Sequence, residues 1–524
     1  MNVIPLPKKY TENEGVYRID GKIRSDFDLP LIADYTEKSD GASFEIIKDE
    51  DVANEGYKLT VTPERLTVKA SSKSGAYYAL QTVRRLCNFD LGGREVPCCE
   101  IEDEPRFKWR GLHLDESRHF FGETEVKRLL DFMFTEKLNI FHWHLTDDQG
   151  WRIEIEKYPL LTEIGSKREY TQVGGWGSGD IEYIPHGGYY TQEQIKNIIA
   201  YAAERGITVV PEIDFPAHCA AAIAAYPGLA CFEKKTEVPG YFGGLIPEKQ
   251  GNLRWNRTLC CGKESTFDFV FGVLDEICDL FPSEYVHIGG DEAPHGEWKR
   301  CEKCQSVMRK NALKNEKALQ GWFESRLISF LKEKGKTAIG WNDIIECPGL
   351  DDDGKSLVIQ YWTPKRDKHA ERYAEGGGAM ILSNHQSFYF DMTYAMMPLD
   401  ATYNYNPRAF GIDADGDNVL GVEGELWSEW IPGREKLDLN AFPRMQALAE
   451  VAWSQENKRD FSDFKRRLDL LKPTLEKLGI GYAVDRVSLN KNIILSSKVQ
   501  SEFRKGNPLF ETELNKEYKA EGEK

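Results

Sequence analysis

Short apolar runs alternate with longer amphipathic runs over residues 104–455, and this alternation restricts the fold more than any other feature of the sequence. The apolar runs are GLHLDE, IFHWHL, ITVVPEID, YVHIGG, TAIGWN, LVIQYW, AMILSN and VLGVEGELW. Amphipathic stretches such as TQEQIKNIIAYAAERG and EKALQGWFESRLISFLKEKG separate most of them. Because alternating strands and helices build parallel sheets, eight such units predict an α/β fold of the (β/α)8 TIM barrel type.

Two further segments flank the predicted barrel. Residues 1–103 contain short strand-like runs with turns, as in YKLTVTPERLTVKASS, and one helical run, SGAYYALQTVRRLC, which together predict a small α+β domain. Residues 456–524 begin with the amphipathic run FSDFKRRLDLLKPTLEKLG, in which Pro473 predicts a kink or a break. From about residue 485 the chain is charged and weakly apolar, so we expect this tail to fray or to be disordered.

The composition limits the partners of the protein. The chain has 524 residues and a formal net charge of −17, which argues against nucleic acid or an anionic membrane as its main partner, because both require a basic surface. No run of about 18 apolar residues occurs, and the N-terminal MNVIPLPKKYTENEG lacks an apolar signal-peptide core. We therefore expect a cytoplasmic protein whose main partner is neither nucleic acid nor a membrane.

The cysteines indicate a reducing compartment. There are eleven of them, an odd number, with adjacent pairs at 98–99 and 260–261. This pattern is not typical of a disulfide scaffold. Only CEKC, with Cys301 and Cys304, has the spacing of a metal-binding pair, and the sequence shows no second CxxC or HxxxH partner for it. We expect ordinary thiols here and no zinc.

Polar and aromatic residues follow the apolar runs. In chain order they are Asp115 with Arg118, Asp147 with Asp148, Asp214 with His218, Asp291 with Glu292, Trp341, Trp362, Tyr389 with Asp391, and Trp427 with Glu429. The active sites of such barrels lie at the C-terminal ends of the strands. Tryptophan faces stack on sugar rings, and carboxylates and arginine bind hydroxyls, so this rim favours a polyhydroxylated ligand. The alternative is that the tryptophans only cap the barrel.

The stretch VHIGGDEAP places two carboxylates side by side after an apolar run. Adjacent residues of a strand point to opposite faces, but Gly289 and Gly290 permit backbone angles that end the strand and turn Asp291 and Glu292 over the barrel mouth. Carboxylates held close together repel, which favours one acid and one anion. The alternative is a solvated loop pair followed by a turn proline.

With these motifs the sequence resembles glycoside hydrolase family 20, the β-N-acetylhexosaminidases. The similar motifs are RGLHLDESRHF, FHWHLTDDQGWRIEIEKYP, VVPEIDFPAH, HIGGDEAP, GWNDI, YFD and LWSEW, in the order of that family, over about residues 110–455. Two motifs depart from the commoner wording, namely PAH, where a glycine often precedes the histidine, and EGELW. Neither departure removes a functional side chain.

The resemblance implies roles for individual residues. Glu292 would be the general acid and base, and Asp291 would orient the substrate's own 2-acetamido group, which acts as the nucleophile. The implied substrate-binding residues are Arg118, Trp341, Trp362, Tyr389, Asp391, Trp427 and Glu429, and the implied supporting residues are Asp147, Asp214 and His218. No cofactor and no metal is implied, so His142 and His144 are expected to be structural histidines of a strand.

The resemblance implies an exo-acting, retaining β-N-acetylhexosaminidase that removes terminal β-linked GlcNAc and GalNAc. The reaction of that family proceeds through an oxazolinium intermediate. Three alternatives stay open: a relative that releases a disaccharide, a barrel hydrolase with a carboxylate nucleophile, and a catalytically silent sugar-binding barrel. A carboxylate nucleophile requires two carboxyl groups about 5–5.5 Å apart on separate strand ends, whereas the pair here is adjacent in sequence.

Overall fold

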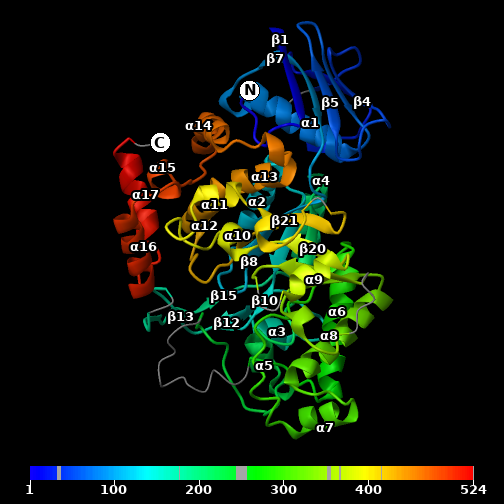
Figure 1. Ribbon diagram of the computed structural model, residues 1–524, viewed down its shortest axis with the longest axis vertical. Helices are drawn as coiled ribbons and strands as arrows, with labels where there is room; N and C mark the ends of the chain where they lie inside the picture. Colours follow the sequence, from blue (N-terminus) through cyan, green and yellow to red (C-terminus); the bar gives the residue numbers. More distant parts are fainter. Residues whose placement is uncertain are drawn as a thin grey trace.

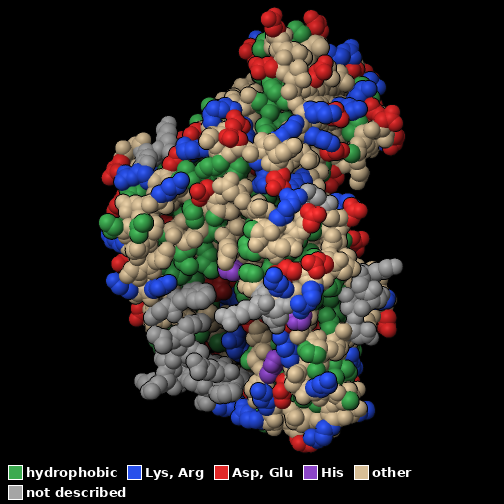
Figure 2. Space-filling view, in the orientation of Figure 1, with side chains coloured by type: hydrophobic (Ala, Val, Ile, Leu, Met, Phe, Trp, Pro, Cys, Tyr) green, Lys and Arg blue, Asp and Glu red, His purple; other side chains and the backbone are tan. Residues whose placement is uncertain are grey.

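The computed structural model describes residues 1–31, 37–175, 178–242, 257–350, 356–364, 368–414 and 416–522. An N-terminal sheet domain lies at one end of a central barrel, and C-terminal helices lie along one side of it (Figure 1). Within those ranges, every helix is too short or too polar to span a bilayer. Acidic and basic side chains are interspersed over the face drawn in Figure 2.

The central part is a closed barrel of eight parallel strands, which confirms the predicted fold class. In chain order the strands are β8 (Trp109–Asp115), β9 (Ile140–His144), β16 (Thr208–Glu212), β17 (Tyr285–His287), β18 (Thr337–Trp341), β19 (Leu357–Tyr361), β20 (Ala379–Leu382) and β21 (Val419–Leu426). The barrel closes where β21 pairs with β8, with Leu426 opposite Leu114. Each strand matches one of the apolar runs of the sequence.

Helices pack around the outside of the barrel strands. They are α2 (Glu123–Thr135), α4 (Gln192–Glu204), α6 (Glu264–Leu280), α8 (Glu316–Glu333), α9 (His369–Glu375), α11 (Leu399–Tyr403) and α13 (Arg444–Trp453). Helix α4 begins with a capping box, in which the Thr191 side chain accepts from the Gln194 backbone and the Gln194 side chain bonds back.

The inside of the barrel changes from apolar to polar along its axis. At the N-terminal ends of the strands, six buried side chains form a separate apolar cluster: Trp109, Ile140, Val210, Ile339, Val358 and Ile381. Above it lie fully buried polar side chains: His113, His142, Glu212, His287, Gln360, Glu423 and Glu425. Several of these groups hydrogen-bond one another: the ring Nδ1 of His142 lies 2.7 Å from Glu423, and the side-chain amide of Gln360 donates to Glu425 at 3.0 Å. The centre of the barrel is therefore a polar layer beneath its open end.

The N-terminal domain is a seven-stranded sheet of order β1-β7-β5-β6-β4-β2-β3 with one helix, α1 (Lys73–Leu86). Its strands are β1 (Lys9–Arg18), β2 (Lys22–Ser25), β3 (Glu37–Lys38), β4 (Phe44–Lys48), β5 (Tyr57–Val61), β6 (Leu66–Ala70) and β7 (Glu95–Asp103). Strand β5 alternates buried and exposed residues, as expected where one face is covered. Buried ion pairs join this domain to the barrel, among them Arg85 with Glu136 at 2.7 Å and Lys137 with Asp103 at 3.2 Å.

The C-terminal residues form helices, and the expectation of a fraying tail was wrong. Helix α14 (Phe461–Lys477) continues through Pro473 without a break. It is followed by α15 (Asp485–Ser488), α16 (Ile493–Lys505) and α17 (Phe510–Ala520), which lie along one side of the barrel (Figure 1). Helix α17 is fixed by Glu511, a buried carboxylate that accepts hydrogen bonds from the backbone of Tyr394 at 3.1 Å and Ala395 at 3.3 Å. A buried carboxylate that holds a helix by hydrogen bonds does not contribute to the apolar periodicity from which helices are predicted.

Candidate active site

A cavity of about 500 Å³ opens at the C-terminal ends of the barrel strands. Nine residues expected at the site from the sequence line it: Arg118, His218, Asp291, Glu292, Trp362, Tyr389, Asp391, Trp427 and Glu429. The other three, Trp341, Asp147 and Asp214, are buried and are not among the lining residues. The structure thus brings the predicted rim together and places three of its members beneath the surface of the cavity.

The Asp291–Glu292 pair lies on a tight turn that two glycines make possible. Gly289 and Gly290 have φ angles of +68° and +92°, and Glu292 itself has φ +47°. A Cβ on Gly289 would lie 1.9 Å from Oδ1 of Asp214, and one on Gly290 would lie 2.2 Å from Cγ2 of Ile344. The side chain of Asp291 is 16% exposed, whereas that of Glu292 is 60% exposed. The turn therefore directs one carboxylate into the protein and the other toward solvent.

We expect Gly290→Ala to destabilise the protein and to displace the carboxylate pair. The added methyl group combines a left-handed backbone with a collision against Ile344, so the cost is about 2–4 kcal/mol. Gly335→Ala is a matched control, because Gly335 has φ +73° and open space around its Cβ position. Thermal unfolding of both variants checks the expectation. Equal losses would show that the collision does not matter.

His218 connects the two carboxylates to the interior. Its Nδ1 lies 3.1 Å from Oδ1 of Asp147, and its Nε2 lies 3.7 Å from Oδ2 of Asp291 and 3.9 Å from Oε2 of Glu292. Burial by itself would lower the pKa of His218, but Asp147 and the other carboxylates around it raise that pKa well above its usual value. His218 is therefore a buried cation that faces both carboxylates.

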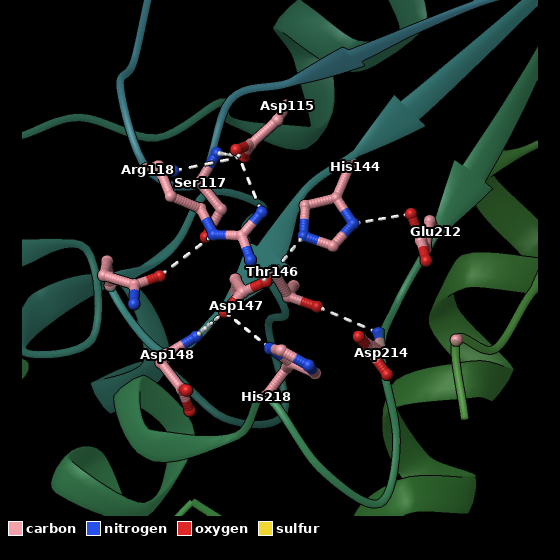
Figure 3. A network of polar contacts seen from close by, with 12 residues as sticks. Asp115, Ser117, Arg118, His144, Thr146, Asp147, Asp148, Glu212, Asp214 and His218 are labelled. Atoms are coloured by element: carbon pink, nitrogen blue, oxygen red, sulfur yellow. Dashed lines mark hydrogen bonds and ion pairs between the residues drawn. The ribbon is translucent and has the colours of Figure 1, made fainter. Parts of the chain in front are cut away.

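Asp147 is the centre of the network drawn in Figure 3. One of its oxygens accepts from the guanidinium of Arg118 at 2.6 Å and also contacts His144 at 3.1 Å, while the other faces His218. Burial opposes the ionised form, yet Arg118 and His218 hold the pKa of Asp147 well below its usual value. Asp147 thus stays an anion that orients a cation on each side.

Arg118 is held in one orientation at the wall of the cavity. Its Nη1 lies 3.1 Å from Asp115, and its Nε donates to Oε1 of Gln149 at 3.0 Å. Glu429 lies 3.8 Å from the same guanidinium, which sits 5.1 Å from the ring of Trp427. A fixed guanidinium beside a carboxylate and an indole face is a good site for the hydroxyl groups of a sugar.

The carboxyl group of Asp214 lies directly behind the turn. Its Oδ1 accepts from the backbone N–H of Gly290 at 3.2 Å. Burial and the nearby charge of Asp291 raise the pKa of Asp214 well above its usual value. Burial also raises the pKa of Asp291 to about 7; His218 opposes this shift and Glu292 adds to it. The two aspartates therefore share an environment that limits ionisation.

Aromatic rings form the opposite wall. Trp362 and Tyr389 are nearly parallel, with an interplanar angle of 22° and a centroid distance of 6.0 Å, and Tyr389 lies 6.3 Å from Trp427. Trp341 lies 5.8 Å from Trp427, and its indole N–H donates to Glu212 at 2.8 Å. The polar centre of the barrel therefore fixes the deepest tryptophan.

Asp391 adds a carboxyl group to the lining of the cavity. It is close to Glu429, and burial followed by the charge of Glu429 raises the pKa of Asp391 well above its usual value. Burial and the charge of Arg118 have opposite effects on Glu429, and the pKa of that carboxyl is also raised. A protonated carboxyl group can donate as well as accept a hydrogen bond, which suits recognition of hydroxyl groups.

Several residues that line the cavity were not predicted from the sequence to belong to the site: Asp148, Gln149, Pro239, Tyr241, Phe242, Arg257, His385, Met392 and Trp430. Asp148 was noted at a strand end, and the structure pairs it with Arg257, more than a hundred residues away. Trp430 directly follows Glu429, so its place in the cavity could have been predicted from the neighbouring site residue. Arg257 lies between strands and carried no such signal.

The histidines of β9 lie among carboxylates. His142 Nδ1 is 2.7 Å from Glu423, and His144 Nδ1 is 2.5 Å from Glu212. Burial by itself would lower the pKa of His142, but Glu423 and Glu212 raise it to about 10. These histidines are therefore cations of the polar barrel centre.

The chain is similar to known proteins over most of its length. The sequence model described as "Glycosyl hydrolase family 20, catalytic domain" matches residues 107–456, and "Glycosyl hydrolase family 20, domain 2" matches residues 27–104. A beta-hexosaminidase of Porphyromonas gingivalis is 36% identical over 92% of this chain, which spans 64% of the length of that relative. A beta-hexosaminidase of Akkermansia muciniphila is 32% identical, with coverage of 81% and 85%.

Solved structures are similar over most of the chain. The β-N-acetylhexosaminidase of Bacteroides fragilis superposes with a TM-score of 0.79 at 34% identity, covering 92% of this chain and 96% of that one. The GH20 exo β-N-acetylglucosaminidase of Vibrio harveyi, solved with N-acetylglucosamine, gives a TM-score of 0.80 at 31% identity, with coverage of 92% and 78%.

Proposed function

Because the chain belongs to glycoside hydrolase family 20, we propose that it removes terminal β-linked GlcNAc and GalNAc residues from the non-reducing ends of oligosaccharides or glycoconjugates. The main support for the proposal is that the two carboxylates of the Asp291–Glu292 pair have different environments. Asp291 is directed inward beside His218, and Glu292 is exposed at the cavity. The similarity to a Vibrio harveyi enzyme solved with N-acetylglucosamine supports the choice of sugar.

The first step breaks the glycosidic bond. The carboxyl proton of Glu292 moves to the glycosidic oxygen, the bond between that oxygen and C1 breaks, and the carbonyl oxygen of the substrate's 2-acetamido group forms a bond to C1. The product of this step is an oxazolinium ion, with positive charge shared by its nitrogen. Asp291, as a carboxylate, accepts the N–H of that group and stabilises the charge.

The second step reverses the first with water. The Glu292 carboxylate takes a proton from a water molecule whose oxygen attacks C1, and the bond from C1 to the acetamido oxygen breaks. Two inversions at C1 restore the β configuration. The exposure of Glu292 supports both tasks, because the same side chain must meet the leaving group and then water.

The remaining cavity residues would hold the terminal sugar. Arg118 and Glu429 would bind hydroxyl groups, with Asp391 beside them, and these contacts would decide how well an axial C4 hydroxyl replaces an equatorial one. Tyr389 would donate to the acetamido oxygen and turn it toward C1. Trp362 and Trp427 would pack against the acetamido methyl and the sugar ring, with Trp341 behind them.

A substrate pair tests the proposal directly. We expect a chromogenic β-GlcNAc glycoside to be hydrolysed at least about 10³-fold faster, in kcat/KM, than the matching β-glucoside, because only the first carries the internal nucleophile. NMR of the first-formed sugar should show the β anomer. Comparable turnover of both glycosides would point to a protein nucleophile, and binding without turnover of either would point to a sugar-binding barrel.

A further inference from the structure

Four cysteines from three separate segments meet beside the barrel. Cys231 follows the short helix η3 (Pro227–Leu229), Cys260 precedes α6, and Cys301 and Cys304 lie at the start of α7 (Glu302–Lys310). Their four sulfur atoms all lie within 4.8 Å of one another. Three of the four residues are buried, and Cys231 is partly buried.

The spacing of the sulfur atoms excludes disulfides and fits a tetrahedron. The Sγ of Cys304 lies 3.7 Å from those of Cys231 and Cys260, and the Sγ of Cys260 lies 3.7 Å from that of Cys301. A disulfide requires about 2.05 Å between sulfurs. Four thiolates around zinc, each at about 2.3 Å from the ion, lie about 3.8 Å apart.

We propose that Cys231, Cys260, Cys301 and Cys304 bind one structural Zn²⁺ through four thiolates. Four protein ligands leave no open position, which is the arrangement of structural and not of catalytic zinc. The four cysteines are not among the lining residues of the active-site cavity, so the ion takes no part in hydrolysis. A tetrahedral set of four sulfurs suits zinc or iron, and a hydrolase moves no electrons, so the redox-inert ion fits better.

The surroundings suit a cluster of thiolates. Cys301 is the N-terminal cap of α7 and Cys304 lies in its first turn, where the free N–H groups and the helix dipole favour negative charge. The backbone supports Cys260, whose N–H donates to Leu229 at 2.8 Å. Close by, the segments of Cys231 and Cys260 are joined by a β-bridge between Ala230 and Leu259. The ligand-bearing segments are therefore positioned by contacts of their own.

The ion would fix two loops of the active site. Cys260 lies three positions after Arg257, which lines the cavity and pairs with Asp148. Cys301 lies nine positions after Glu292. The indole N–H of Trp298, between Glu292 and Cys301, donates to Leu259 at 2.9 Å and joins the same two segments. A zinc ion there would link the loop of the carboxylate pair to the loop of Arg257.

Metal analysis of the purified wild-type protein is the primary test. We expect about one zinc per chain, and X-ray absorption should show four sulfur ligands at about 2.3 Å. After removal of zinc under reducing conditions, added Co²⁺ should give the intense visible bands of tetrahedral thiolate coordination. Iron in place of zinc, a disulfide among the four residues, or a reduced protein that takes up neither Zn²⁺ nor Co²⁺ would overturn the proposal.

Cysteine variants localise the site. Cys304→Ser should lose at least about tenfold in zinc affinity and lower the thermal unfolding temperature. Cys278→Ser is a matched control, because Cys278 is a buried cysteine of α6 outside the cluster, and it should keep one zinc per chain. A zinc affinity of Cys304→Ser equal to that of the wild type and of Cys278→Ser would exclude the four-cysteine site. The wild-type measurement stands without any variant, so failure of Cys304→Ser to fold does not remove the test. Both readouts are independent of glycosidase activity.

Discussion

Glu292→Gln is expected to lower kcat for a β-GlcNAc glycoside with a poor leaving group by about 10²–10⁴-fold. Glutamine keeps the shape of the side chain but has no proton to give to the glycosidic oxygen. The exposed position of Glu292 suggests that the substitution leaves the fold intact, so the loss should lie in the chemical step and KM should change little.

A series of aryl leaving groups separates loss of the acid from a general loss of activity. An activated leaving group needs no proton, so the first step in Glu292→Gln should recover as the leaving group improves. Wild-type activity should vary much less. Glu333→Gln, at the exposed end of α8, is the control and should behave as wild type throughout. An equal loss for every leaving group would mean that Glu292 is not the acid.

The barrel was predictable because its signal is local. Each strand is a short, mostly buried run, and the residue types at its end decide what faces the cavity. Asp291 and Glu292 could be assigned to one site because the glycines before them explain how adjacent side chains share it, and the structure has both glycines in the left-handed region. Their chemical roles remain predictions.

The polar centre of the barrel was not predicted, although a signal exists. The strands stand out in the sequence as apolar runs, yet in several of them polar residues recur two positions apart, as in His113 with Asp115 and Glu423 with Glu425. Residues two apart on a strand share a face, so these side chains had to point into the barrel together. This alternation indicates a polar interior beneath the site.

Contacts between distant segments could not be read from one sequence. The sequence shows CEKC as a pair without partners, and the structure brings Cys231 and Cys260 to it from separate loops. Cys231 has no ligand-like neighbour in the sequence, and the only such neighbour of Cys260 is the adjacent Cys261, which lacks the spacing of a metal-binding pair. Local spacing therefore gave no signal for this cluster. The pairing of Arg257 with Asp148 was missed for the same reason. In each case the fold, and not a motif, supplies the partner.

Asp291→Asn is expected to lower kcat for β-GlcNAc glycosides by about 10²–10³-fold. Asparagine is nearly isosteric but cannot offer a negative charge to the oxazolinium nitrogen. The wild-type pKa of about 7 for Asp291 in the unliganded protein also predicts that kcat/KM rises with pH through this range, as the carboxylate forms. That limb of the profile should be absent in Asp291→Asn.

The same substitution should stabilise the protein at high pH. The pKa of Asp291 is raised by burial from an ordinary value near 4 to about 7, so the folded state holds a proton that the unfolded state releases. The contribution of this carboxyl group to the free energy of unfolding is fully present below about pH 4, declines as the pH rises toward 7, and is lost above about pH 7. Asparagine never ionises, so the free energy of unfolding of the variant increasingly exceeds that of the wild type between about pH 4 and 7. Above pH 7 the difference stays constant, on the order of a few kcal/mol.

Thermal unfolding at several pH values measures this effect. At about pH 4 the wild type and Asp291→Asn should unfold at similar temperatures, and at pH 8 the variant should unfold about 2–6 °C higher. Asp268→Asn, an exposed aspartate of α6, should show no such growth with pH. A variant that is less stable than wild type at pH 8 would mean that Asp291 is held as a well-stabilised anion by His218. A gain in stability with loss of activity would mean that the buried charge is kept for catalysis at the expense of the fold.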